Sequence, residues 1–294
     1  MRVLRDDAVG AAGAWLRGRI GAWATVGGVA GTGFEAYARV LHPVPGRRLS
    51  WDDDGRGMVP RVVDEREWAW GEVASAVGAV MHPLVQWRRL ADENGFVRLD
   101  DGWEVGQTRD GWLDPVLWAA LVPHLARVGA PEVTLGFWIG RGDFDGGGRH
   151  VTVALAGDDA GAGFPPALPE VSADALEARA RGELLVLPGQ EGTGREHLMM
   201  AGALADLADP DWGYRAAIGW WGPFRDPAPQ LAWPADHAWL VASEIDWDST
   251  IVAGSRALVD AVLADPAVEA FEVGPDDDLS WDGDTVNPPR AERS

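Results

Sequence analysis

Apolar residues recur every three or four positions in several segments of the first 130 residues. In "GFEAYARVLHP", residues 33–43, this spacing predicts a helix that the final proline ends. A similar stripe in "EREWAWGEVASAVGAVMHP" predicts a helix over residues 65–83. In "GWLDPVLWAALVPHL", Asp114 is suited to the N-cap and Pro115 to the first helical position of a third helix.

Short apolar runs separated by glycine and proline predict strands in the rest of the chain. Two further helices are expected, at residues 194–210 and, with Ser255 as N-cap, at residues 255–266. The predicted strands are residues 133–140, 151–157, 183–189, 216–222, 238–246 and 268–273.

Helices and strands that neither alternate strictly nor separate into blocks are typical of an α+β fold. We expect a mainly helical first part packed on a mixed or antiparallel sheet formed mostly by the C-terminal half. Residues 1–20 would form an N-terminal extension, residues 21–287 a single α+β domain, and residues 288–294 a flexible tail. Within the domain, residues 21–130 would be a helical lobe and residues 131–287 a sheet-containing lobe.

Four stretches together resemble a family of uncharacterised (hypothetical) proteins from high-GC actinobacteria. They are "GFEAYARVLHP", "GWLDPVLWAALVPHL", "WPADHAWLVASEIDWDSTIVAGSRALVDAVLADP" and "DDDLSWDGDTVN". The similar region spans roughly residues 21–287 and is strongest in residues 233–266. That family has no assigned activity, so the resemblance implies one co-operating unit and assigns no site residue.

The chain has 46 acidic and 25 basic residues, and its formal net charge is −21. This charge repels phosphate groups, so we expect no binding to nucleic acid or membranes. It favours a basic protein partner or a cationic ligand; alternatively, the charge serves solubility alone. The first residues contain no continuous apolar run typical of an export signal or a membrane span, so we expect a cytoplasmic location. The absence of cysteine excludes disulfides and thiol nucleophiles.

Most motifs of known catalytic sites are absent from the sequence. No H-E-x-x-H or G-x-S-x-G motif occurs, and a P-loop is excluded because the chain contains no Lys. The stretch "DFDGGG", residues 143–148, begins like a calcium-binding loop, but Gly147 and Ala154 stand where acidic ligands are required. We therefore expect no cofactor and no metal site, and the sequence leaves open whether the protein is an enzyme.

The motif LSWD occurs twice, in "PGRRLSWDDD" and in "PDDDLSWDGD". A repeated functional element would carry its surrounding elements with it, but a helix is expected before the first copy and a strand before the second. Arg47 and Arg48 of the first copy correspond to Asp277 and Asp278 of the second. We therefore interpret the copies as two acidic turns, each fixed by a tryptophan, without a common function.

The candidate site is the stretch "WLVASEIDWDS", residues 239–249. In one extended strand, Glu244, Asp246 and Asp248 would share a face and lie about 7 Å apart. This strand end and a loop over residues 249–255 would form a rim that binds a cation or a basic side chain; alternatively, the carboxylates form the hydrated face of a half-buried strand. Tryptophans nearby in the sequence would form the apolar walls of the site: Trp220, Trp221 and Trp233.

Three functions are compatible with these features. The first is a non-catalytic protein that binds a basic or cationic protein partner, since the charge is negative and catalytic motifs are absent. The second is a hydrolase that uses the Asp/Glu cluster with a hard cation such as Mg²⁺. The third is a carbohydrate-binding protein, because 17 tryptophans could supply sugar-binding surfaces.

Overall fold

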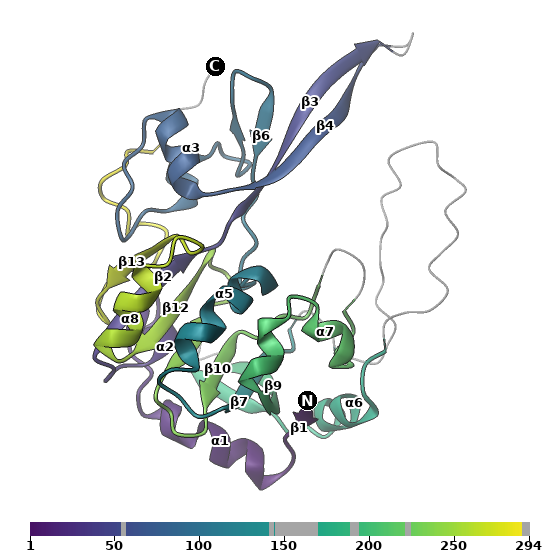
Figure 1. Ribbon diagram of the computed structural model, residues 1–294, viewed down its shortest axis with the longest axis vertical. Helices are drawn as coiled ribbons and strands as arrows, with labels where there is room; N and C mark the ends of the chain where they lie inside the picture. Colours follow the sequence, from purple (N-terminus) through teal and green to yellow (C-terminus); the bar gives the residue numbers. More distant parts are fainter. Residues whose placement is uncertain (54–56, 141–143, 145–169, 189–193, 221–224, 290–294) are drawn as a thin grey trace.

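The computed structural model contains two antiparallel sheets with helices packed on them (Figure 1). It describes residues 1–53, 57–140, 144, 170–188, 194–220 and 225–289. Within these residues one sheet has nine strands and the other has four. The mixture of helices with antiparallel sheets confirms the predicted α+β class.

The nine-stranded sheet forms the body of the molecule. Its strands follow the order β1-β9-β7-β10-β11-β12-β2-β13, and β8 pairs with β9. They are β1 (Arg2–Val3), β2 (Ala36–Leu41), β7 (Glu132–Trp138), β8 (Leu185–Pro188), β9 (Gly194–Ala203), β10 (Leu231–Pro234), β11 (Leu240–Ser243), β12 (Ser249–Gly254) and β13 (Ala270–Val273). Apart from β1 and β2, every strand of this sheet follows residue 130, so the sheet is formed mostly by the C-terminal half.

Helices cover both faces of the large sheet. One face packs against α5 (Pro115–Leu125), α6 (Ala173–Ala180) and α8 (Arg256–Leu263), and the other packs against α1 (Asp7–Arg17) and α2 (Val26–Ala30). The side with α5, α6 and α8 contains the first core, and the side with α1 and α2 contains the second core. Because alternate side chains of a strand point to opposite faces, Ala38 and Val40 of β2 lie in the first core and Tyr37 lies in the second. This strand is therefore buried along its whole length.

The four-stranded sheet forms a smaller lobe with its own apolar core. Its order is β4-β3-β6-β5. The elements of this lobe are β3 (Val44–Asp53), β4 (Met58–Trp68), β5 (Val97–Arg98), β6 (Trp103–Val105), α3 (Trp70–Val77) and α4 (Trp87–Leu90). Trp68, Trp70 and Trp87 are buried in its core.

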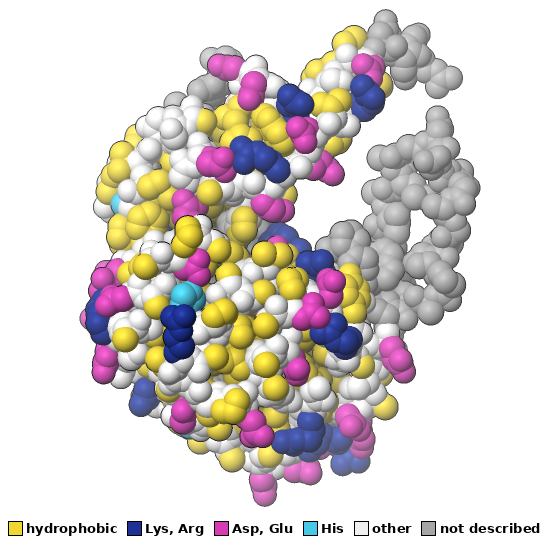
Figure 2. Space-filling view, in the orientation of Figure 1, with side chains coloured by type: hydrophobic (Ala, Val, Ile, Leu, Met, Phe, Trp, Pro, Cys, Tyr) yellow, Lys and Arg dark blue, Asp and Glu magenta, His cyan; other side chains and the backbone are white. Residues whose placement is uncertain are grey.

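Beyond this core, β3 and β4 continue as a two-stranded ribbon that projects from the molecule (Figure 1). Apolar side chains are exposed along it (Figure 2); Trp51 is 57% exposed and Met58 is 60% exposed. The first LSWD copy lies on this ribbon. Its interpretation as an acidic turn is therefore wrong, because residues 49–52 are paired with β4.

The predicted elements whose ends carry clear capping residues are confirmed. In α5 the Asp114 carboxylate accepts a hydrogen bond from the Val116 N–H, and Pro115 is the first helical residue. In α8 the Ser255 hydroxyl accepts a hydrogen bond from the Leu258 N–H. The expected strands over residues 133–140, 183–189 and 268–273 appear as β7, β8 and β13.

Two predicted helices are strands in the structure. Within residues 33–43, Ala36–Leu41 form β2, because β12 and β13 pair with its two edges and the cores on both sides of the sheet bury its two faces. Residues 194–203 form β9, followed by a short 3₁₀ helix, η2 (Leu204–Ala208). In both cases a buried strand accepts the same apolar residues as a helix, and long-range pairing decides between them.

The expectation of a mainly helical first part is wrong, because β1 to β6 all lie before residue 130. The predicted helix over residues 65–83 is divided between the end of β4 and α3. Of the expected strand over residues 216–222, the structure shows an isolated bridge between Ile218 and Val171. The expected strand over residues 151–157 lies outside the described residues.

The N-terminal segment contacts the large sheet through two elements. β1 pairs with β9, and Leu16 of α1 is buried against the second face. The division into an extension, a domain and a tail stays a prediction. Within the described residues, no helix has the length and apolar character needed to cross a membrane.

Candidate binding site

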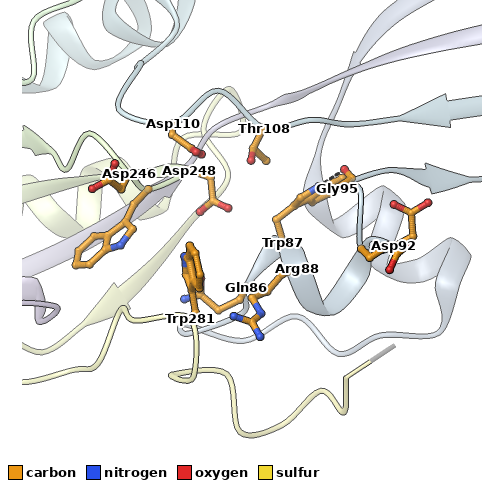
Figure 3. A pocket seen from close by; sticks show the side chains of 12 residues that line it. Gln86, Trp87, Arg88, Asp92, Gly95, Thr108, Asp110, Asp246, Asp248 and Trp281 are labelled. Atoms are coloured by element: carbon orange, nitrogen blue, oxygen red, sulfur yellow. Dashed lines mark hydrogen bonds between the residues drawn. The ribbon is translucent and has the colours of Figure 1, made fainter. Parts of the chain in front are cut away.

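A cavity of about 290 Å³ lies where the large sheet meets the smaller lobe (Figure 3). The turn between β11 and β12 forms one wall, and the others are formed by the region of α4, the segment that follows β6 and the C-terminal segment with Trp281. Five carboxylates, three tryptophans and one arginine are among its lining residues. The described residues that line it are Gln86, Trp87, Arg88, Asp92, Glu93, Gly95, Thr108, Asp110, Asp246, Trp247, Asp248 and Trp281.

The turn of residues 244–248 carries the predicted carboxylates. β11 ends at Ser243, the Trp247 N–H donates to the Glu244 carbonyl (3.1 Å), and Ser249 begins β12. The predictions of one extended strand over residues 239–249 and of a loop over residues 249–255 are therefore wrong, because the chain turns after β11 and Ser249–Gly254 form β12. The apolar alternation persists because Ile245 and Trp247 are buried within the turn, not because the strand continues.

Two of the predicted carboxylates bind the same arginine. Arg195 of β9 donates from Nη2 to Glu244 Oε1 (2.6 Å) and to Asp246 Oδ2 (2.9 Å). Burial raises the pKa of Glu244, while the Arg195 charge opposes this rise. The basic side chain that these two carboxylates bind thus belongs to the chain itself. Of the two, Asp246 lines the cavity, and its side chain is 60% exposed.

Asp248 and Ser249 contact a buried arginine of β2. Arg39 donates from Nε to Ser249 Oγ (2.9 Å), and its Nη2 lies 3.7 Å from Asp248 Oδ1. Its Nη1 donates to the carbonyls of Pro83 and Val85. These hydrogen bonds fix the segment that precedes Gln86. Burial raises the pKa of Asp248, and the Arg39 charge opposes the rise. Ser249 therefore positions Arg39, and Asp248 faces the cavity in front of it.

The predicted tryptophan walls lie elsewhere in the molecule. Trp220 is buried in the first core, where its indole N–H donates to the Pro227 carbonyl (2.8 Å). Trp233 is buried in the second core and packs edge-on against Trp15. Trp221 lies outside the described residues. The tryptophans that line the cavity are Trp87, Trp247 and Trp281.

The second LSWD copy supplies Trp281, the most exposed tryptophan of the cavity. Its side chain is 64% exposed, and the Arg88 guanidinium carbon lies 5.5 Å from the ring centroid. The sequence favoured the stretch 239–249 over both LSWD copies as the location of a site. The structure brings Asp246 and Asp248 together with the second copy (Figure 3).

Gln86 is held in the cavity wall by its backbone. Its N–H donates to Asp284 Oδ2 (3.2 Å), while the imidazole of His82 contacts Asp284 Oδ1 (2.8 Å). Gln86 is only 6% exposed, yet its side-chain Nε2 has no hydrogen-bond partner among the described residues. No sequence motif marked Gln86, Asp92, Glu93 or Asp110, because tertiary contacts alone bring them here.

No group of three or more His, Asp or Glu side chains within the described residues has an arrangement that could hold a metal ion. The calcium-like stretch at residues 143–148 lies outside them except for Phe144, which is buried in the first core. Comparisons of the chain with protein-family models, curated proteins and solved structures found no match. The resemblance to actinobacterial proteins stays a prediction, and the cavity is the basis for a functional conclusion.

Proposed function

We propose that this chain is a non-catalytic binding protein for a basic protein partner, and that a basic side chain of the partner enters the cavity. The observation that supports the proposal is the lining of the cavity, where the described residues include five carboxylates and one arginine, Arg88. The net charge of −21 would also attract a basic partner at long range.

The carboxylates differ in how strongly the chain itself neutralises them. Asp92 pairs with Arg98 (2.5 Å), and Asp246 and Asp248 lie beside Arg195 and Arg39. Such a carboxylate retains further acceptor positions, because two oxygens can accept about four hydrogen bonds. A cation that enters the cavity would also contact indole rings, whose faces attract positive charge.

The proposal is tested by titrating a hexa-arginine peptide into the protein in a calorimeter. Replacing Glu93→Gln and Asp246→Asn together removes two exposed charges from the lining. We expect about tenfold weaker binding, since each exposed charge contributes of the order of 1 kcal/mol or less to such an interaction. Raising the salt concentration should weaken binding to the unaltered protein more than to the variant.

The matched control is Asp100→Asn with Asp101→Asn, which makes the same change in net charge. Both residues are exposed and precede β6 outside the cavity lining. Equal loss of affinity in both variants would show that only the overall charge acts. Absence of peptide binding to the unaltered protein would contradict the proposed function.

Carbohydrate binding is a second candidate, supported by the exposed ring of Trp281 beside carboxylates. Aromatic rings and acidic side chains together are typical of sugar-binding surfaces. A glycan array distinguishes the two functions, because sugar binding would be lost in Trp281→Ala and would change little with salt. For the cation-dependent hydrolase there is no comparable observation, since the described residues contain no cluster of side chains arranged to hold a metal ion.

The same charge balance supports two expectations that accompany this function. We propose that the protein does not bind nucleic acid, because a charge of −21 repels phosphate groups. A gel-shift assay at physiological salt would reveal a local basic groove if binding occurred. The proposed location is cytoplasmic, which fractionation of the source cells would test.

A further inference from the structure

One donor in the cavity wall has no acceptor among the residues that the structure describes. Gln86 is 6% exposed, lines the cavity, and its Nε2 has no hydrogen-bond partner among the described residues. Buried amide groups are almost always hydrogen-bonded, and an unused one at a cavity indicates a missing partner. This donor is independent of the carboxylates, and a ligand with an acceptor oxygen would satisfy it.

The volume of the cavity limits the size of that ligand. At about 290 Å³ it lies at the lower end of the roughly 300–1,000 Å³ range for small-molecule sites. A single amino-acid side chain with its adjoining main-chain carbonyl is of suitable size. Such a group offers a cation to the carboxylates and an acceptor to the Gln86 amide.

The aromatic wall favours a guanidinium over an ammonium group. A guanidinium is planar, stacks on indole rings and donates in several directions to separate carboxylates. The chain already places one such group, that of Arg88, 5.5 Å from the centre of the Trp281 ring. Because Trp281 is 64% exposed, part of its ring surface remains accessible to a second planar group.

We infer that the cavity takes an arginine residue of a peptide, with the guanidinium beside Asp246, Asp248 and Trp281 and the main-chain carbonyl accepting a hydrogen bond from Gln86 Nε2. Figure 3 shows Gln86 next to Trp281 on one wall, facing the row of carboxylates on the other. This inference rests on the proposed function and specifies which residue of the partner is recognised.

Three small probes separate the contributions. N-acetyl-L-arginine amide has both groups, butylguanidine lacks the carbonyl, and N-acetyl-L-lysine amide replaces the guanidinium. In calorimetric titrations we expect the arginine amide to bind about tenfold more tightly than butylguanidine and than the lysine amide. In Gln86→Met, which keeps the length and loses the amide, the preference for the arginine amide over butylguanidine should disappear.

A measurement without substitution accompanies this test, because a buried residue is altered in Gln86→Met. In a ¹H–¹⁵N spectrum of the unaltered protein, the Gln86 side-chain amide signal should shift downfield with the arginine amide and not with butylguanidine. An unshifted signal, or a preference that persists in Gln86→Met, would overturn the role of Gln86. Equal affinity for the lysine amide would overturn the choice of arginine.

The outcomes also separate this inference from the proposed function. If hexa-arginine binds and depends on Glu93 and Asp246, but the probes show no dependence on Gln86, the inference alone fails. If neither hexa-arginine nor any probe binds the unaltered protein, both fail.

Discussion

At the scale of single residues, Arg88 opposes the charge of the cavity that it helps to form. Of the described residues that line the cavity, it is the one with a positive charge, and its guanidinium lies over Trp281. An arriving cation would meet this like charge beside the accessible part of the Trp281 ring. If the cavity binds basic ligands as proposed, Arg88 would reduce its affinity for them.

We predict that Arg88→Gln binds hexa-arginine about fivefold more tightly than the unaltered protein. Removing a like charge about 6 to 8 Å from a bound cation is worth roughly 1 kcal/mol at a partly hydrated site. Calorimetry measures the change, and Arg127→Gln, an exposed residue after α5, controls for net charge. Weaker binding by Arg88→Gln would mean that Arg88 contacts the ligand favourably.

At the scale of elements, two backbone segments meet tightly at the cavity. The Gly111 N–H donates to the Trp247 carbonyl (2.8 Å), and the Gly111 carbonyl accepts from Gln230 Nε2 (2.9 Å). Gly111 has a φ of +63°, and a Cβ there would lie 2.6 Å from the Ile245 Cα. The segment with Thr108 and Asp110 can therefore approach the β11–β12 turn only because residue 111 is glycine.

We predict that Gly111→Ala destabilises the protein and weakens hexa-arginine binding, because the added methyl group must push the two cavity walls apart. Gly78→Ala is the matched control: its φ is +74°, but no atom lies within 4 Å of the added Cβ. The control should lose about 1–2 kcal/mol of unfolding free energy from the backbone conformation alone. Urea unfolding should show a larger loss for Gly111→Ala; an equal loss would indicate that the walls are not in contact.

The elements also show where sequence patterns are sufficient and where they are not. Capping residues act locally, so Asp114 and Ser255 predicted the starts of α5 and α8 correctly. The apolar spacing of β2 and β9 suited either a helix or a strand, and pairing with distant strands decided. Those pairings are not visible in a local pattern.

The candidate site was predictable in part for the same reason. Asp246 and Asp248 were found because they are close together in the sequence, and both line the cavity. The tryptophans expected to form the walls were chosen by the same proximity in the sequence. Trp220 and Trp233 do not line the cavity, because both are packed in the apolar cores. Trp281 lies more than 30 positions from the turn, and only the fold brings it there.

At the scale of the whole molecule, acidic and basic side chains are distributed in small mixed groups over the face shown in Figure 2. Many of the pairs that they form are exposed, as Arg48–Asp64 and Arg61–Asp52 are. Exposed pairs contribute little to stability, typically well under about 1 kcal/mol each. The pH dependence of stability should therefore arise mainly from groups buried in the sheets.

Two buried histidines belong to this class. His42 Nδ1 must donate to the Arg109 carbonyl (3.0 Å), since a carbonyl only accepts, and Nε2 then accepts from the Thr250 hydroxyl (2.8 Å). Burial lowers the pKa of His42 to about 4, and the charges of Arg39 and Arg109 act in the same direction. Burial likewise lowers the pKa of His197 in β9 to about 4.

Both histidines should make the protein less stable as the pH falls from 6.5 toward 4. In this range the unfolded chain, in which a histidine has a pKa of about 6.5, binds protons that the folded protein excludes. Each histidine should remove about 2 kcal/mol of unfolding free energy between pH 7 and pH 5.

Buried carboxylates with a raised pKa, such as Asp248, act in the opposite direction, so the total change alone does not isolate the histidines. Urea unfolding followed by tryptophan fluorescence at the two pH values isolates them by comparison with variants. The decrease should be smaller by about 2 kcal/mol in His42→Gln and by about 4 kcal/mol when His197→Gln is added. The same decrease in the variants and the unaltered protein would show that these imidazoles are protonated in the folded state and are not excluded from water.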